Sequence, residues 1–309
     1  MRLLLVVNTS ASSVTARARV VIQKALSADH EVALKETNRR GHATRLAQGA
    51  AADGLDVVVV LGGDGTLNEA ANGLAGSTTA LGVLPGGSTN VFARTIGLSN
   101  DPIEATSQLL SALAAGSVER VGLGQANSRY FLFHAGIGFD AAVVARVEKL
   151  AALKRYTGPA VFVMATLLTW AHGYDRRAPQ FSVSGPGLPP ASGSFGICMN
   201  TDPYTFFGNR PMHVARGTSL ATPLSLVTLD RLSLVVLLPV LAAAFRGGLS
   251  NHSGKHVAVA RNLQAVTVTG LRPLPYQLDG DYVGESEQIE LRWAPAALAL
   301  VKPLDAKVG

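Results

Sequence analysis

The chain has 309 residues, which fits one large domain or two ordinary ones, and its formal net charge of +6 favours polyanionic partners such as nucleotides or an anionic membrane. Charged residues make up 16% of it, and the mean hydropathy of +0.26 indicates a large core or contact with membrane or apolar substrate. The single Cys198 excludes an internal disulfide and suits a reducing cytosol, and the chain has no basic run dense enough to indicate a nucleic-acid partner.

Residues 1 to about 122 alternate apolar strand-like runs with helical patterns. This alternation predicts a Rossmann-like parallel α/β domain, in which ligands bind at the carboxyl ends of the strands. Met1–Asn8 has no small-residue cleavage site and predicts a first strand rather than a signal peptide. The expected strands are Leu3–Val7, Glu31–Glu36, Asp56–Leu61 and Ala80–Leu84, and the expected helices are Ala16–Ser27, His42–Asp53, Leu67–Leu74 and Ile103–Ala115.

Residues 123–309 have a different pattern of many short strands with turn residues between them. This pattern predicts an antiparallel β-sandwich domain, and Ala297–Val301 is a last strand that could return to the first domain. The apolar segments Ala160–Ala171 and Leu232–Phe245 are shorter than the about 20 residues that cross a bilayer. The other expected strands are Arg129–His134, Gln180–Val183, Ser194–Met199, Ser233–Leu238, His256–Val259, Ala265–Thr269 and Glu287–Arg292.

The most informative stretch is the buried strand Val57–Leu61, which runs directly into Gly62-Gly63-Asp64-Gly65-Thr66. Glycines let a ligand approach the backbone closely, and the helix that follows directs unpaired N–H groups and its positive dipole end at the turn. Asp64 would repel a phosphate unless a cation lay between them. The stretch therefore predicts a nucleotide phosphate bound together with Mg2+, although any strand-turn-helix unit favours Gly and Asp at its turn.

Four further motifs follow the Gly-Gly-Asp-Gly-Thr-Leu-Asn-Glu stretch in order. They are Leu84-Pro85-Gly86-Gly87-Ser88-Thr89-Asn90, Ala135-Gly136-Ile137-Gly138-Phe139-Asp140-Ala141, Leu229-Asp230-Arg231-Leu232-Ser233-Leu234 and Gln277-Leu278-Asp279-Gly280-Asp281. With these five motifs in this order, the whole chain resembles the bacterial diacylglycerol kinase family of lipid kinases, which is related to sphingosine kinases and NAD kinases.

The resemblance implies an ATP site and a role for each of its residues. Asp64 corresponds to the carboxylate that organises the catalytic Mg2+. The nucleotide contacts implied in this way are Asn8, Thr37, Gly62, Gly63, Asp64, Gly65, Thr66, Leu67, Asn68, Ser88 and Asn90.

Two further sites are implied in the second domain. Asp230, with the carbonyls of Val227 and Leu232, corresponds to a structural Mg2+ site, and an oxygen-only donor set suits Mg2+; Asp230 could equally cap a turn. Asp281 corresponds to the catalytic base, which takes the proton of the attacking lipid hydroxyl. Asp-Gly is also a favoured turn dipeptide, so we expect Asp279 to fix the turn while Asp281 acts in the reaction.

Three positions depart from the family pattern. The first loop, Asn8–Ser13, lacks the usual proline, glycine and basic residue, so only hydroxyls remain there to bind phosphate. Val91 stands where diacylglycerol kinases often have aspartate, which puts diacylglycerol specificity in doubt. Asp281 replaces the family's usual glutamate, so the carboxylate is one methylene shorter.

The sequence therefore predicts an ATP-dependent lipid kinase that phosphorylates a diacylglycerol-like or sphingoid lipid at the cytosolic membrane face. An NAD kinase-like enzyme and an inactive nucleotide-binding regulator are the alternatives. We also expect peripheral contact with an anionic membrane surface, and a homodimer is a further expectation. Residues 141–180 support the membrane contact, because they contain two acidic side chains and the basic Arg146, Lys149, Lys154, Arg155, Arg176 and Arg177.

Overall fold

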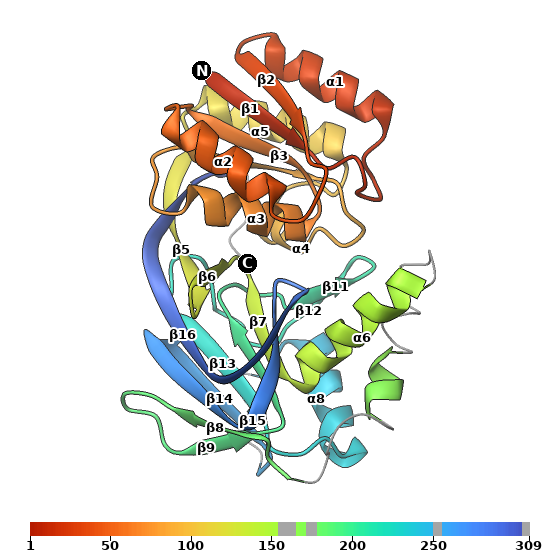
Figure 1. Cartoon of the computed structure of the whole chain (residues 1–309), viewed down its shortest axis with the longest axis vertical. Coiled ribbons are helices and arrows are strands. Elements are labelled where there is room, and N and C mark those ends of the chain that lie inside the picture. The colour runs from red at the N-terminus through yellow and green to blue at the C-terminus, as the bar shows by residue number, and fades with distance from the viewer. Residues whose placement is uncertain (154–164, 171–177, 250–254, 305–309) are drawn as a thin grey trace. The chain divides into compact units, whose positions relative to one another are not determined.

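The computed structural model describes residues 1–153, 165–170, 178–249 and 255–304 (Figure 1). The chain forms two compact units. Unit 1 contains Met1–Leu123 and Ala294–Gly309, and unit 2 contains Gly124–Trp293. The strands β5 (Val118–Ala126) and β16 (Asp281–Val301) each run across this boundary. Most of the apolar segment Ala160–Ala171 lies outside the described residues.

Unit 1 is built on a parallel sheet with the strand order β2-β1-β3-β4. Every residue of β3 and β4 is buried, as expected for strands covered on both faces. The last part of β16 pairs with β4 through Leu300 and Leu81. The elements are β1 (Arg2–Val7), α1 (Ala16–Ser27), β2 (Glu31–Glu36), α2 (His42–Ala52), β3 (Val57–Gly62), α3 (Asp64–Leu74), β4 (Ala80–Pro85), α4 (Val91–Thr95) and α5 (Pro102–Ala114).

Unit 2 is mostly antiparallel, and its sheet has the strand order β14-β13-β10-β7-β15-β16. The strand β8 pairs with β15 and with β9, and β11 pairs with β12. The elements are β6 (Arg129–Phe131), β7 (His134–Gly138), α6 (Phe139–Leu153), β8 (Phe181–Ser184), β9 (Ala191–Gly193), β10 (Phe195–Met199), β11 (Thr205–Phe207), β12 (Arg210–Met212), β13 (Leu224–Leu229), α8 (Leu234–Arg246), β14 (Val257–Leu263) and β15 (Ala265–Leu278).

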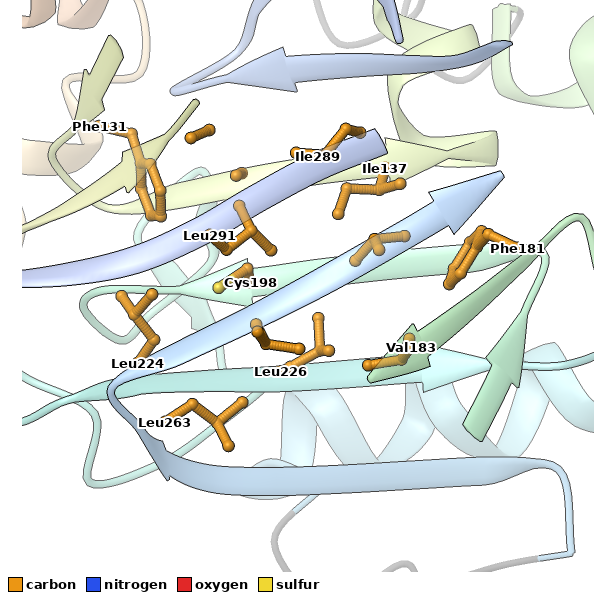
Figure 2. Close-up of a cluster of buried hydrophobic side chains, with 14 of the residues drawn as sticks. Phe131, Ile137, Phe181, Val183, Cys198, Leu224, Leu226, Leu263, Ile289 and Leu291 are labelled. Carbon is orange, nitrogen blue, oxygen red and sulfur yellow. The ribbon is translucent and has the colours of Figure 1, made fainter. Parts of the chain in front are cut away.

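The core of unit 2 lies among these strands (Figure 2). Its fully buried side chains include those of Phe131, Cys198, Ile289 and Leu291, and Leu226 is 3% exposed. Their burial follows from the alternation of apolar and polar residues, which turns one face of each strand inward. The structure confirms the predicted fold class, a parallel α/β domain followed by an antiparallel β domain.

One predicted strand is wrong. Ser233–Leu238 was expected to be extended, but Leu234–Arg246 forms the helix α8, with Pro239 inside it. The run Leu-Val-Val-Leu-Leu has neither a two-residue nor a 3.6-residue period, and its apolar continuation to Phe245 is too long for a typical strand. No helix within the described residues has both the length and the apolar character that crossing a bilayer requires.

Two glycine loops in unit 1 approach each other through their backbones. The amide N–H of Gly86 donates to the Gly62 carbonyl at 2.9 Å. A Cβ built on Gly86 would lie 2.9 Å from the Gly62 Cα, and one built on Gly87 would lie 2.9 Å from the Gly63 Cα. Gly86 and Gly87 therefore cannot carry a side chain without a shift of the backbone opposite.

We predict that Gly87→Ala lowers the free energy of unfolding, because the added methyl meets backbone atoms that cannot move aside. Overpacking of this kind typically costs about 1–3 kcal/mol. Gly49→Ala is the matched control, since a Cβ there meets nothing within 4 Å and alanine favours the helix interior. Urea unfolding of both variants checks this, and an equal effect of the two substitutions would contradict the close approach.

Candidate active site

The residues predicted to bind nucleotide gather along one edge of the sheet in unit 1. Because β1 to β4 are parallel, their carboxyl ends lie together, and Asn8, Thr37 and Gly63 directly follow the first three strands. The Asn8 side-chain amide donates to the Thr66 hydroxyl at 2.9 Å, which links the first loop to the glycine loop. The Thr37 N–H donates to the Val7 carbonyl at 2.9 Å.

The glycine loop after β3 leads into α3 without a side-chain cap. Gly63 is the N-cap residue, and it contributes no side-chain hydrogen bond. The predicted contacts Thr66, Leu67 and Asn68 are buried, with exposures of 9%, 1% and 0%. The partly exposed backbone of residues 63–65 is therefore the part of this loop that a phosphate could approach, at the positive end of the helix dipole.

Asp64 has a structural role that the sequence did not predict. It is the first residue of α3, and its carboxylate accepts hydrogen bonds from two backbone N–H groups, those of Val91 at 2.9 Å and Phe92 at 3.0 Å. Each oxygen takes one bond, so the carboxylate holds the first turn of α4 against the glycine loop. Asp64 is also partly exposed, so the same carboxylate borders solvent beside the glycine loop.

The second glycine loop is closed by Asn90. This residue has a left-handed backbone, and it is 2% exposed. Its side-chain oxygen accepts the Gly87 N–H at 2.7 Å, and its amide donates to the Gly87 carbonyl at 2.8 Å. Asn90 therefore shapes the loop from inside, whereas Ser88 is exposed at the tip and is the residue here that can reach a ligand.

The altered first loop is fastened to the second glycine loop. The Ser13 N–H donates to the Gly86 carbonyl at 2.9 Å, and the Ser13 hydroxyl donates to the Gly87 carbonyl at 3.0 Å. Ser13 was expected as one of the hydroxyls that bind phosphate, but its own proton is used in this contact. Ser10 is exposed, with its N–H donating to the Asn8 side chain at 3.0 Å.

Sequence reasoning gave no role to Glu69, the last residue of the Gly-Gly-Asp-Gly-Thr-Leu-Asn-Glu motif. Its carboxylate accepts the N–H groups of Gly41 at 2.7 Å and Ala43 at 3.1 Å, at the start of α2. The Thr44 hydroxyl also donates to the Glu69 carbonyl at 2.8 Å. Glu69 thus caps α2 in the way that Asp64 caps α4, and the signal for it was an acidic residue one helical turn beyond the glycines.

In unit 2, Asp279 fixes the turn before the predicted base. Asp279 has a left-handed backbone and is 4% exposed. Its carboxylate accepts the N–H groups of Leu132, Phe133 and His134 at 2.6, 2.9 and 3.1 Å. The turn is therefore tied to the segment between β6 and β7.

Asp281 opens β16 directly after this turn. Its side chain is 29% exposed, and it forms an ion pair with Arg129, with 3.8 Å between the Arg129 Nη2 and the Asp281 Oδ2. The residue therefore has the accessible carboxylate that a general base needs. The role itself stays a prediction.

Asp140, from the motif Ala135–Ala141 of unit 2, is buried in a hydrogen-bonded network. Its carboxylate accepts from the Tyr204 hydroxyl and from the Gln277 amide, each at 2.8 Å. Burial raises the pKa of Asp140, whereas these two hydrogen bonds lower it. A Cβ on Gly136 would lie 1.8 Å from the Asp140 Oδ2, so the glycine makes room for the carboxylate. This network was not predicted from the sequence.

The predicted structural metal ligands lie at the end of β13. Val227 lies within the strand, the Asp230 carboxylate is 2.9 Å from the His256 Nδ1, and the Leu232 carbonyl accepts the Trp170 indole N–H at 2.7 Å. The three donors are all oxygens, and each keeps further lone pairs, so the set fits Mg2+ chemically. Among the described residues, no three His, Cys, Asp or Glu side chains come together as a metal site.

Comparisons with known proteins agree with the resemblance seen in the sequence. Residues 2–126 match the family model "Diacylglycerol kinase catalytic domain". The diacylglycerol kinase of Bacillus subtilis (strain 168) is 38% identical over 120 residues, a match that spans 38% of this chain and 39% of that protein. The diacylglycerol kinase of Staphylococcus saprophyticus is 25% identical over 281 residues, spanning 86% of this chain and 83% of that protein.

Solved structures share the fold. A diacylglycerol kinase from Bacillus anthracis str. Sterne superposes with a TM-score of 0.74 at 17% identity, covering 99% of this chain and 98% of that chain. An NAD kinase from Archaeoglobus fulgidus in complex with ATP gives a TM-score of 0.55 at 12% identity, with 99% and 95% covered.

We predict that Asp64→Asn lowers the free energy of unfolding by about 1–3 kcal/mol. The amide nitrogen cannot accept a hydrogen bond, so one of the two backbone N–H groups at the start of α4 loses its partner. Asp101→Asn is the control. Asp101 caps α5 through Oδ1 alone, which accepts from Ile103 and Glu104, so its amide retains the cap. Urea unfolding compares the two, and equal losses would refute the two-oxygen cap at Asp64.

Proposed function

The chain belongs to the bacterial diacylglycerol kinase family of lipid kinases, and from this we propose that it transfers the γ-phosphate of ATP to the hydroxyl of a diacylglycerol-like or sphingoid membrane lipid. The observation that carries the proposal is the carboxyl edge of the unit 1 sheet. There the two glycine loops pack backbone to backbone, and the start of α3 leaves residues 63–65 partly exposed to a phosphate.

In the proposed reaction the lipid hydroxyl oxygen bonds to the γ-phosphorus of ATP, and the bond from that phosphorus to the β–γ bridging oxygen breaks. ADP leaves, and Asp281 accepts the hydroxyl proton. Arg129, 3.8 Å from the Asp281 carboxylate, orients the base. Mg2+ bound with the nucleotide, held through the Asp64 carboxylate, would neutralise part of the phosphate charge. Asp230 and the carbonyls of Val227 and Leu232 would hold a structural Mg2+.

Asp281→Asn should lower turnover about 10²–10⁴-fold with little change in the ATP dissociation constant, because the amide keeps the size of the side chain but cannot take a proton. Asp281→Glu should retain substantial activity. The assay offers ATP and Mg2+ with micellar diacylglycerol, a sphingoid base or soluble NAD, and the products are read by mass.

Three outcomes of this assay would contradict the proposal. Phosphorylated NAD would point to the NAD kinase alternative. No product with any acceptor would point to a nucleotide-binding regulator. Lipid turnover by Asp281→Asn equal to that of the parent would show that the base lies elsewhere.

The proposed enzyme works at the cytosolic membrane face, and α8 is its docking element. The side chains of Leu234, Val235, Leu238, Leu241 and Phe245 are 46–84% exposed. Positions 234, 235, 238, 241 and 245 lie within one third of the helix circumference and form one face. The opposite side packs into the core through the buried Ala243 and Ala244.

The charges around α8 match an anionic bilayer. Arg231 and Arg246 are exposed at its two ends, and residues 231–246 contain no acidic side chain. An apolar helix face flanked by arginines suits insertion into the headgroup layer, where the cations meet anionic lipids.

We expect Val235→Glu and Leu238→Glu to lose most cosedimentation with phosphatidylglycerol vesicles, because each places a charge in the apolar face. Ile103→Glu in α5 is the control, with a similarly exposed apolar residue of 48% in unit 1. Light scattering of the same variants tests the alternative use of this face. A parent dimer that the α8 substitutions dissociate, with vesicle binding unchanged, would assign the face to a homodimer instead.

A further inference from the structure

Unit 2 contains a pocket of about 580 Å³ that the proposed reaction does not use. Its walls come from α6, from the Arg272–Pro275 segment of β15 and from the beginning of β16. Three of its lining residues are the cations Arg146, Lys149 and Arg272, and the carboxylate that lines it is Glu285. The pocket therefore has a net positive lining.

The cations are placed by regular structure. Ala142, Ala145, Arg146 and Lys149 are spaced at three and four residues along α6, so they share one face of that helix. The two alanines have short side chains, so they leave space for the pocket beside this face of the helix. Lys154, Arg155, Arg176 and Arg177 of the same basic segment lie outside the described residues.

These cations are available to a ligand. Within the described part of the chain, none of Arg146, Lys149 and Arg272 forms an ion pair. Arg272 makes one long hydrogen bond within the described residues, from its Nη2 to the Gln180 Oε1 at 3.5 Å. Three unpaired cations around one pocket repel each other, and an anion between them would relieve that repulsion.

A second, independent feature is Thr169, which also lines the pocket. It is 2% exposed, and its hydroxyl has no hydrogen-bond partner among the described residues. Buried hydroxyls normally have a partner, and leaving one unsatisfied costs free energy. Thr169 therefore brings an unsatisfied buried hydroxyl to the wall of the pocket.

The lining also contains apolar surface, from Pro273, Leu274 and Pro275. A pocket with cations and an apolar side suits an amphiphile with an anionic head. We propose that it binds the phosphate headgroup of an anionic phospholipid.

The bound lipid is not the one that accepts the phosphoryl group. Tyr282 lines the pocket and directly follows Asp281 on β16. Consecutive residues of a strand direct their side chains to opposite faces, so a ligand beside Tyr282 is turned away from the Asp281 carboxylate. The pocket thus provides a separate lipid contact, which rests on the proposed function only for its effect on activity.

Binding is tested without ATP, so that it does not depend on catalysis. Calorimetry measures dihexanoyl phosphatidylglycerol, dihexanoylglycerol and inorganic phosphate against the parent protein. We expect the phosphatidylglycerol to bind most tightly, and Arg146→Gln and Arg272→Gln each to weaken it about tenfold. Arg292→Gln is the matched control, an arginine of unit 2 that is 63% exposed and paired with Glu290.

Each other outcome overturns the proposal. Equal binding of dihexanoylglycerol would show that the cations do not select a phosphate. Inorganic phosphate that binds as tightly as the lipid would indicate a free-phosphate site. An equal loss in Arg292→Gln would indicate general electrostatics. Salt titration of the parent gives a reading that needs no variant, because binding through these cations must weaken as salt rises.

A second measurement addresses activity. In neutral micelles containing diacylglycerol, Arg146→Gln should match the parent, and added anionic phospholipid should stimulate the parent but not the variant. If no kinase activity is found while phosphatidylglycerol still binds, the proposed function fails and the pocket assignment stands. If kinase activity is found without selective phosphatidylglycerol binding, the pocket assignment fails and the proposed function stands.

Discussion

The structure of unit 1 depends on the contact between two stretches of bare backbone. Gly62 and Gly63 lie against Gly86 and Gly87 at distances where a Cβ would collide. Because these loops end two neighbouring parallel strands, their approach brings the start of α3 next to the start of α4. The N–H groups of α4 then need an acceptor, and Asp64 provides it with both carboxylate oxygens. The glycines and the aspartate of one motif thus form a single arrangement, in which neither can change alone.

In unit 2, too, aspartate carboxylates are held by hydrogen-bond donors from other parts of the chain. A buried carboxylate, Asp140, needs space and donors, which Gly136 and the pair Tyr204 and Gln277 supply. Burying it without these donors would be costly. The neighbouring Asp279 instead gathers three backbone N–H groups. These two aspartates are used up in holding the fold, whereas Asp281 keeps a partly exposed carboxylate. The buried pair therefore holds the fold, and the partly exposed aspartate is the one for which a reactive role is proposed.

The sequence predicted unit 1 better than unit 2. Each strand of unit 1 is a short apolar run that ends at a turn signal, so periodicity located β1 to β4 within one or two residues. In unit 2 the helix α8 was taken for a strand, and α6 was overlooked although its alanines favour helix. The carboxylate roles of Asp64 and Glu69 could not be predicted, because their partners lie 26–28 residues away and are backbone groups without a sequence signal. Propensity describes local preference, whereas capping across loops is decided by tertiary structure.

Unit 2 presents two chemically different surfaces, and each is proposed to contact a different part of a membrane lipid. The helix α8 exposes apolar side chains with arginines at its ends, and the face of α6 exposes cations around a pocket. One cluster of buried residues links these regions, because Phe139 and Val143 of α6 pack with Leu232, which lies just before α8. The Trp170 indole adds a hydrogen bond to the Leu232 carbonyl. Close-packed interiors deform little, so these packed side chains form a physical connection between the two surfaces. The same Leu232 carbonyl belongs to the proposed Mg2+ site, so the metal would stiffen the segment that joins the two surfaces.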